Sequence, residues 1–190
     1  AVATNSATSA LHIACLSLDL KKGDYVWTSP ISFVASSNCA LYCGAKIDFI
    51  DIDPSTFNIC IQALKRKLII AKKKNKLPKI LIPVHLGGLS CDMLEIKNLA
   101  KKFKFKIIED ASHAIGGRYR DKPIGNCKYS DITVFSFHPV KIITSAEGGM
   151  ALTNNKELTN KMKMLRNSGI TRDKKIMRNP NNNPWYYEQL

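Results

Sequence analysis

Short apolar runs alternate with longer amphipathic segments along most of this 190-residue chain. The apolar runs have the length and composition of buried strands, and the segments between them have the period of helices. Strands separated by helices of this length predict an α/β fold, with a mainly parallel sheet flanked by helices on both faces. The predicted strands are 1–4, 25–28, 46–50, 79–84, 106–109, 132–137 and 150–153, and the predicted helices are 8–20, 33–43, 61–74, 92–103 and 157–167.

The two ends of the chain differ from its middle. The chain starts within a strand and without Met, and it ends on Trp185, Tyr186 and Tyr187, which need a surface to pack against. Residues 172–184 are rich in Asn, Lys, Arg and Pro, a composition typical of a loop or hinge. The length suits one sizeable domain. We therefore expect the middle of a longer protein.

The formal net charge is +14, which raises nucleic acid as a partner. The lysines cluster in 65–76 and 101–106, where they are interleaved with apolar residues at near-helical spacing. Almost all are Lys rather than the Arg that phosphate and base recognition favours, and no stacking aromatics lie among them. The pattern favours solvated helix faces and no nucleic-acid partner, with a basic nucleic-acid-binding module as the rival of a different class.

Membrane, redox and metal signals are weak. No apolar run approaches the roughly 20 residues of a membrane span, and no signal peptide is visible. The six cysteines contain no C-x-x-C pair, and with the four histidines they show no metal-ligand spacing. We expect a cytoplasmic protein without a metal site, with reduced core thiols at Cys15, Cys39, Cys43, Cys60, Cys91 and Cys127.

The segment after the predicted strand 132–137 carries the strongest chemical signal. It places Ser136, His138 and Lys141 near the strand's end, followed by the pair Gly148-Gly149. Open α/β sheets hold ligands in such loops. A lysine there, followed by glycines where backbone can approach a ligand closely, is arranged to form a Schiff base with an aldehyde cofactor. The alternative is an ordinary solvated loop lysine.

Two other predicted strand ends carry complementary groups. Residues 5–11 enter a helix through small and hydroxylated side chains, and a helix N-terminus suits a phosphate. Simple N-capping by Ser6 or Thr8 is the alternative. Asp110 follows an apolar strand, where a carboxylate can pair with a protonated pyridine nitrogen and keep that ring an electron sink. The alternative role of Asp110 is to cap the next segment.

Phe33 and His113 also follow predicted strands. Phe33 has the flat face needed to stack on a cofactor ring, although a core position is the usual fate of a phenylalanine. His113, three residues after Asp110, is either a residue of the site or a structural histidine whose hydrogen bonds are made within the fold. The order of these groups is the specific signal: a phosphate cradle, an aromatic, a carboxylate, and then a serine and a lysine.

This ordered set resembles the pyridoxal-phosphate-dependent sugar aminotransferases of the DegT/DnrJ/EryC1/StrS type, over essentially the whole chain. The resemblance implies the large domain of the aspartate aminotransferase fold (fold type I) and pyridoxal 5'-phosphate as cofactor. It implies Lys141 as the catalytic Schiff-base lysine and Asp110 as the partner of the ring nitrogen. The implied cofactor-binding residues are Ala7, Thr8, Ser9, Phe33, Asp110, His113, Ser136 and Lys141, and the implied substrate-binding residues are Ala7, Ser136 and His138.

Within that family, residues 5–11, 136–138 and 185–187 resemble the transaminases of pseudaminic acid biosynthesis. That branch implies transfer of an amino group from L-glutamate to C4 of a UDP-linked 4-keto-6-deoxy-N-acetylhexosamine, for surface polysaccharide and flagellin glycosylation. An aminotransferase for another nucleotide-linked 4-keto sugar is the rival within the class. Lys141 argues against the related dehydratases, which have His in its place. Ala7 and Ala146 stand where many members have Gly, and both are small.

The resemblance also implies parts that lie outside this chain. Members of the family are considerably longer, and they work as homodimers in which an Asn of the second subunit reaches the phosphate. We therefore expect residues 1–170 to be the cofactor-binding large domain without its N-terminal segment. Residues 171–190 are expected to be a hinge toward an absent C-terminal small domain. We expect the 190 residues alone to be inactive.

Overall fold

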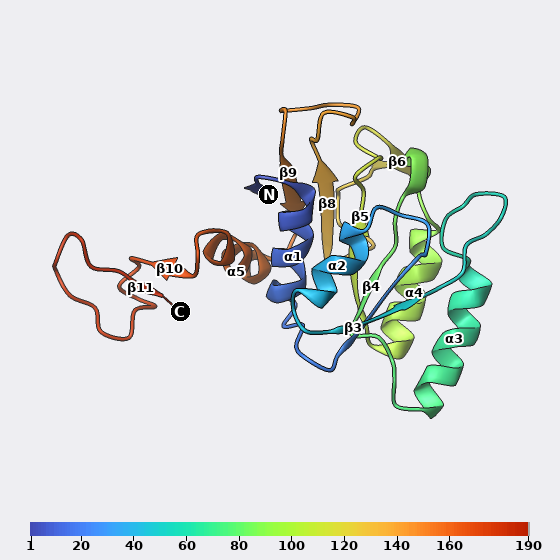
Figure 1. The fold of residues 1–190 in the computed structure, drawn as a ribbon, viewed down its shortest axis with the longest axis horizontal. Coiled ribbons are helices and arrows are strands. Elements are labelled where there is room, and N and C mark those ends of the chain that lie inside the picture. Colours follow the sequence, from blue (N-terminus) through green and yellow to red (C-terminus); the bar gives the residue numbers. More distant parts are fainter. Residues whose placement is uncertain (190) are drawn as a thin grey trace.

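The computed structural model describes residues 1–189, in which helices alternate with the strands of a central sheet (Figure 1). The strands of this sheet are β1 (Val2–Thr4), β2 (Tyr25–Thr28), β3 (Lys46–Phe49), β4 (Ile80–Ile82), β5 (Lys106–Asp110), β8 (Ile132–Ser136) and β9 (Gly149–Leu152). The helices are α1 (Ala7–Ser17), α2 (Ala35–Leu41), α3 (Ile61–Lys73), α4 (Met93–Phe103) and α5 (Lys156–Arg166). The predicted α/β class is confirmed.

The seven strands form one sheet in the order β1-β9-β8-β5-β4-β2-β3. The pairings of β3, β2, β4, β5 and β8 with one another are parallel, whereas β9 is antiparallel to both β8 and β1. The connection from β8 to β9 is therefore a hairpin loop, residues 137–148, at the carboxyl edge of the parallel strands. The mainly parallel sheet is as predicted. The reversed direction of β9 is a feature that strand periodicity alone does not reveal.

The helices cover both faces of the sheet. One hydrophobic cluster joins α1, α2 and α5 to one face, and a second joins α3 and α4 to the other. Successive strand residues point to opposite faces. Accordingly, Ile80, Ile82 and Ile108 belong to the first cluster, whereas Leu81 and Ile107 belong to the second, and all five side chains are fully buried. Burial on both faces explains why these strands are continuously apolar in sequence.

Two helix boundaries differ from the predictions, and the second difference affects the site. The first helix ends at Ser17, because Asp19 adopts a left-handed backbone with φ of 57°. The second helix begins at Ala35 and leaves Phe33 in the preceding loop. Short elements that the sequence did not predict are the hairpin β6 (Arg118–Tyr119) with β7 (Lys122–Pro123), the pair β10 (Ile170–Thr171) with β11 (Glu188–Gln189), and the 3-10 turn η1 (Leu86–Gly88).

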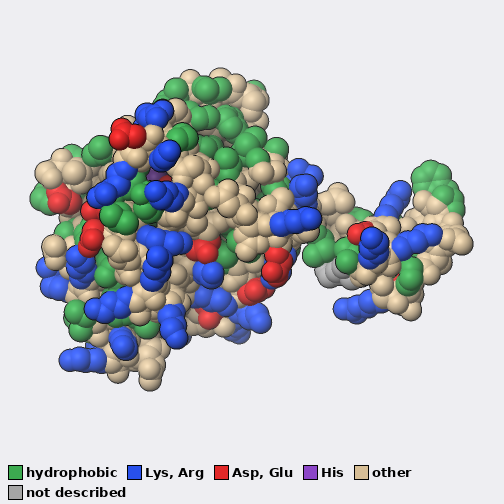
Figure 2. Space-filling view, turned by 180° about the vertical axis from the view of Figure 1, so that it is seen from behind, with side chains coloured by type: hydrophobic (Ala, Val, Ile, Leu, Met, Phe, Trp, Pro, Cys, Tyr) green, Lys and Arg blue, Asp and Glu red, His purple; other side chains and the backbone are tan. Residues whose placement is uncertain are grey.

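The lysine-rich helix α3 is amphipathic as predicted. It buries Leu64, Leu68 and Ala71 and directs its lysines outward. Figure 2, which views the molecule from behind, shows Lys and Arg side chains over the surface with acidic side chains among them. The segment with β10 and β11 projects from the body beyond α5 (Figure 1). Among residues 1–189, none of the helices has the length and apolar character that crossing a bilayer requires.

Candidate active site

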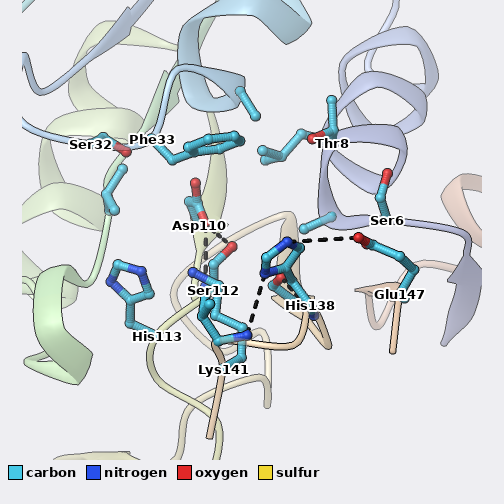
Figure 3. A pocket seen from close by; sticks show the side chains of 17 residues that line it. Ser6, Thr8, Ser32, Phe33, Asp110, Ser112, His113, His138, Lys141 and Glu147 are labelled. Atoms are coloured by element: carbon cyan, nitrogen blue, oxygen red, sulfur yellow. Dashed lines mark hydrogen bonds and ion pairs between the residues drawn. The ribbon is translucent and has the colours of Figure 1, made fainter. Parts of the chain in front are cut away.

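A cavity of about 330 Å³ lies at the carboxyl edge of the sheet. Its walls come from the start of α1, the loop before α2, the end of β5 and the β8–β9 loop (Figure 3). Segments far apart in the chain therefore meet here, as the strand-end argument predicts. The sequence-predicted residues that line the cavity are Ala7, Thr8, Phe33, Asp110, His113, Ser136, His138 and Lys141.

Asp110 ends β5 and is only 3% exposed. Its Oδ2 accepts a hydrogen bond of 2.7 Å from the Ser36 hydroxyl on α2. Its Oδ1 accepts bonds from the Ser112 hydroxyl (2.6 Å) and the Ser112 backbone N–H (3.2 Å). Asp110 thus closes a local turn, the alternative that the sequence left open, and also presents a buried carboxylate to the cavity. The three donors fix its orientation.

The N-terminus of α1 forms one end of the cavity. Ser6 is the N-cap: its hydroxyl accepts a 3.2 Å bond from the backbone N–H of Ser9. The first intrahelical bond runs from the Ala10 N–H to the Ser6 carbonyl. The N–H groups of Ala7 and Thr8 precede it, so the helix itself leaves them without acceptors. With the positive end of the helix dipole, these groups make an anion-binding corner.

The glycine pair after the lysine loop has a packing role. A Cβ built on Gly149 would collide with the Ser6 carbonyl group and approach the Ala7 backbone nitrogen to 2.5 Å. A Cβ on Gly148 would meet the side chain of Phe137 at 3.3 Å. We expected these glycines to let a ligand approach. Gly148 does line the cavity, but the space beside Gly149 is filled by the chain's own helix terminus.

The β8–β9 loop holds Lys141 by a turn. The Lys141 N–H donates to the His138 carbonyl at 2.9 Å. The His138 N–H donates to the Ser136 hydroxyl at 3.5 Å, and the Val140 N–H donates to His138 Nδ1 at 3.4 Å. His138 Nε2 lies 3.7 Å from a carboxylate oxygen of Glu147. These contacts place Lys141, His138 and Glu147 together along one wall of the cavity.

Phe33 is 70% exposed although it is a large apolar residue. It therefore has little packing within this chain, and a core role is ruled out. Figure 3 shows the Phe33 ring and Lys141 on opposite sides of the cavity, with Asp110 between them. A flat ring held between them would present one face to the phenyl group and the other to the amine.

His113 stands beside the carboxylate and the lysine. Its Nδ1 accepts a 3.3 Å bond from the Gly87 backbone N–H. Burial lowers the pKa of His113, and the positive charge of Lys141 lowers it further, while the negative charge of Asp110 opposes both. The imidazole is thereby favoured in its neutral form. Figure 3 shows His113 on the side of the cavity away from Thr8 and Ser6.

Comparison with known proteins agrees with this geometry. Residues 1–183 match the model of the DegT/DnrJ/EryC1/StrS aminotransferase family. The chain belongs to this family. The family that the sequence predicts is thus confirmed, and with it the kind of fold, since similar solved structures are aminotransferases.

Three relatives illustrate the similarity. The UDP-4-amino-4,6-dideoxy-N-acetyl-beta-L-altrosamine transaminase of Campylobacter jejuni serotype O:23/36 is 46% identical over 168 residues, which are 88% of this chain and 43% of that protein. The structure of Helicobacter pylori PseC, an aminotransferase involved in the biosynthesis of pseudoaminic acid, is 33% identical with a TM-score of 0.81, covering 98% of this chain and 46% of that one. The PLP-form of Spr1654, a putative sugar aminotransferase of Streptococcus pneumoniae, is 27% identical with a TM-score of 0.79, covering 100% and 49%. The chain thus spans about half the length of such relatives.

The structure places one predicted residue of this family site elsewhere. Ser9 does not line the cavity; it lies on a neighbouring surface, and its hydroxyl is 3.1 Å from that of Ser6. The N-cap Ser6 occupies the cavity instead. The sequence named Ser6 only as a possible N-cap, and it did not single out Ser36, Ser112 or Glu147. Ser112 lies two residues after Asp110, the spacing of an Asx turn, so its bond to Asp110 could have been predicted from the sequence. Ser36 is far from Asp110 in the chain, and no residue near it indicates their bond.

The donors in the cavity fit pyridoxal 5'-phosphate. The α1 terminus and the hydroxyls of Thr8 and Ser136 suit a phosphate group. The buried carboxylate of Asp110 suits a protonated ring nitrogen, and Phe33 suits the ring face. Lys141 supplies a primary amine for an aldehyde.

Proposed function

We propose that this chain is the cofactor-binding part of a pyridoxal-phosphate-dependent aminotransferase that acts on a nucleotide-linked 4-keto-6-deoxy sugar. The observation that carries the proposal is that Lys141 and the buried Asp110 line one cavity, together with the anion-binding terminus of α1. The similarity to the UDP-sugar transaminase and to PseC supports the finer proposal. This finer proposal is that the reaction belongs to pseudaminic acid biosynthesis, with a UDP-sugar as the acceptor and L-glutamate as the amino donor.

The phosphate and the ring of the cofactor have different holders in this proposal. The N–H groups of Ala7 and Thr8 and the hydroxyl of Ser136 bind the phosphate. The Asp110 carboxylate holds the protonated ring nitrogen, and Phe33 covers the ring. When bound, the cofactor supplies an electron sink for the charge that develops on the reacting carbon. Asp110 preserves that property because a carboxylate favours the protonated ring.

Lys141 has two tasks in this proposal. Its amine would hold the cofactor through the aldehyde while no substrate is bound, and it would be free once a substrate amine is bound. The freed Nζ then takes a proton from the substrate carbon and returns one to the cofactor side. His138 and Ser136 line the same cavity as Lys141, and in this proposal they contact the substrate.

We propose that a second copy of the protein covers the apolar rim of the cavity. Phe33, Val34, Val140, Ile142 and Ile143 are each between 54% and 78% exposed. Figure 2 shows hydrophobic side chains gathered at the end of the molecule that carries the β8–β9 loop. An apolar patch of this kind is typical of a protein interface. Ile142→Glu with Ile143→Glu should yield monomers in solution, whereas Ile69→Glu, an exposed change on α3, should not.

Amino transfer to defined sugars tests the function. The natively expressed protein is loaded with the cofactor and given L-glutamate with a panel of UDP-, GDP- and dTDP-linked 4-keto sugars, and the products are identified by mass spectrometry. The proposal expects an amino sugar and 2-oxoglutarate in equal amounts, with the UDP-linked 4-keto-6-deoxy-N-acetylhexosamine turned over fastest.

The other outcomes of this assay separate the alternatives. Faster turnover of a GDP- or dTDP-linked sugar would favour the rival substrate and leave the reaction type intact. A protein that takes up no cofactor and instead binds nucleic acid would overturn the proposal as a whole.

A further inference from the structure

A hydrogen-bonded polar cluster lies buried behind the cavity. His85, in the segment after β4, has no exposed surface. Its Nδ1 accepts a 3.2 Å bond from the Cys91 backbone N–H. The proton of the neutral ring therefore sits on Nε2, which lies 3.0 Å from Oε2 of Glu109. His85 thus donates to Glu109 in a fixed orientation.

The second oxygen of Glu109 is also satisfied. Its Oε1 accepts a 3.2 Å bond from the Thr133 hydroxyl of β8, and that hydroxyl lies 3.2 Å from the hydroxyl of Ser130. Burial raises the pKa of the Cys91 thiol to about 12, and the negative charge of Glu109 acts in the same direction. The thiol is therefore uncharged. Glu109 is a buried carboxylate held by neutral donors, an arrangement that is costly unless every bond is made.

This cluster is attached to the backbone that carries Asp110. Glu109 directly precedes Asp110 on β5, so the two carboxylates point to opposite faces of the strand. The His85 N–H donates to the Asp110 carbonyl at 3.0 Å, and the Asp110 N–H donates to the Pro83 carbonyl at 3.0 Å. His85 therefore holds Asp110 through its backbone and Glu109 through its ring. Both attachments lie at the last residues of the strand.

We propose that His85 and Glu109 are positioning residues that hold the Asp110 carboxylate in register with the ring nitrogen of the cofactor. This inference rests on the proposed function. Asp110 ends its strand: the Ala111 N–H still donates to the Val134 carbonyl of β8 at 2.9 Å, and the chain then turns away. The bonds to β8 on one side and to the segment of His85 on the other therefore hold this strand end. The His85–Glu109 bond anchors that strand end from the opposite side. A displaced carboxylate would still be present but would pair less well with a protonated ring.

The test replaces Glu109 by Gln in the natively expressed protein. The amide keeps the shape but has one acceptor oxygen where the carboxylate has two, so it cannot accept from both His85 and Thr133, and it also lacks the negative charge. The protein is loaded with pyridoxal 5'-phosphate carrying a heavy-isotope label at the ring nitrogen, and the protonation of that nitrogen is followed by NMR across pH. We expect the pH at which the nitrogen loses its proton to fall by about one unit, because Asp110 favours the charged ring less.

Three further proteins complete the design. Asp110→Asn removes the carboxylate itself, so it gives the largest shift expected in the pH at which the ring nitrogen loses its proton. Thr133→Val removes one donor to Glu109 and should give a smaller shift in the same direction, which keeps the test usable if Glu109→Gln does not fold. Asp131→Asn is the matched control, because its Oδ2 accepts the Ile107 N–H at the opposite end of β5, at 2.9 Å. It should leave the ring titration unchanged.

The outcomes distinguish the inference from the function on which it rests. A wild-type protein that binds no cofactor overturns both. A wild-type protein that binds the cofactor, with Glu109→Gln and Thr133→Val folded and titrating like Asp131→Asn, overturns the positioning role alone. Shifts in Glu109→Gln and Thr133→Val that are smaller than that of Asp110→Asn and absent from Asp131→Asn support it, because a general loss of stability would not move the ring titration selectively.

Discussion

The Ser36 hydroxyl on α2 lies 2.7 Å from Oδ2 of Asp110 on β5, although 74 residues separate them in the chain. The same Ser36 hydroxyl is 2.8 Å from that of Ser32, in the loop that carries Phe33. Two serines therefore link the proposed ring-nitrogen partner to the loop of the proposed stacking residue. The orientation of Asp110 and the position of Phe33 are coupled through Ser36.

Replacing Ser36 by Ala should weaken cofactor binding. The change removes a donor to a buried carboxylate, and a loss of about tenfold in affinity is expected for one such bond. Equilibrium dialysis of the cofactor against variant and wild type measures it. Ser37→Ala is the control, since the Ser37 hydroxyl is exposed and bonds only to the Val34 carbonyl of its own helix. Equal affinities for the two variants would contradict the role given to Ser36.

Replacing Lys141 by Ala should abolish turnover while the protein stays folded. No other described residue lining the cavity carries a primary amine that can bind the aldehyde. Borohydride reduction should fix the cofactor covalently to the wild type and not to the variant, as seen by mass spectrometry. The exposed Lys128→Ala is a control for loss of a lysine elsewhere. A Lys141→Ala protein with even a tenth of wild-type turnover would make the assignment wrong.

Asp110→Asn should retain the cofactor but lose most of the activity. A neutral amide does not favour the protonated ring, so the ring becomes a poorer electron sink. Slowing of about a thousandfold, or about 4 kcal/mol on the barrier, is the expected order of magnitude. Single-turnover rates with L-glutamate measure this effect, and an unchanged rate would place Asp110 outside the site.

Gly149→Ala should damage the phosphate end of the cavity. Its Cβ would collide with the Ser6 carbonyl group, so the start of α1 must move away from β9. A destabilisation of about 2–3 kcal/mol, with weaker phosphate binding, is expected from such overpacking. Gly23→Ala is the comparison: Gly23 has φ of +93° and open space around it, so only backbone strain is added. Urea unfolding and binding of inorganic phosphate separate the two effects.

Acid should destabilise the protein partly through His113. Burial and Lys141 lower its folded pKa below the ordinary 6.5, so between these values the unfolded chain binds more protons than the folded one. The contribution to stability is therefore complete above pH 6.5 and is lost as the pH falls through the folded pKa. Burial also lowers the pKa of His12, so His12 adds to the loss of stability in acid. Thermal unfolding from pH 7.5 to 5.5 should show a smaller loss for His113→Gln, and the smallest for His113→Gln with His12→Asn.

Local patterns were enough to predict the layers of the fold. Runs such as Ile80–Ile82 are apolar because both faces of the sheet are covered, and this apolar composition identifies them as buried strands from the sequence alone. The direction of β9 could not be predicted in this way, because a short apolar run such as Gly149–Leu152 has the same composition in either direction. The connection before it, residues 137–148, contains no helical period, and a parallel crossover almost always needs a helix. The absence of a helical period in this connection could therefore have predicted the antiparallel direction of β9.

The site was predictable to the extent that its residues follow strands. Asp110, Lys141 and Phe33 were found in this way, and the structure puts all three around one cavity. Ser36 was not, since nothing near it in the sequence indicates that its partner lies on another strand. Ser9 was taken from the family resemblance and Ser6 was considered only as an N-cap, whereas in the structure Ser6 lines the cavity and Ser9 does not.

The reversed strand β9 also determines when the cavity can exist during synthesis. Val2 of β1 pairs with Ala151 of β9, and Gly149 packs against the first turn of α1. Contacts so distant in sequence form slowly and only after the intervening chain has been made. On the ribosome, β1 and the start of α1 emerge before β9 and remain without this neighbour until β9 has been made. The anion-binding corner is thus translated well before the strand that completes it, and it takes its final shape only after β9 has been made.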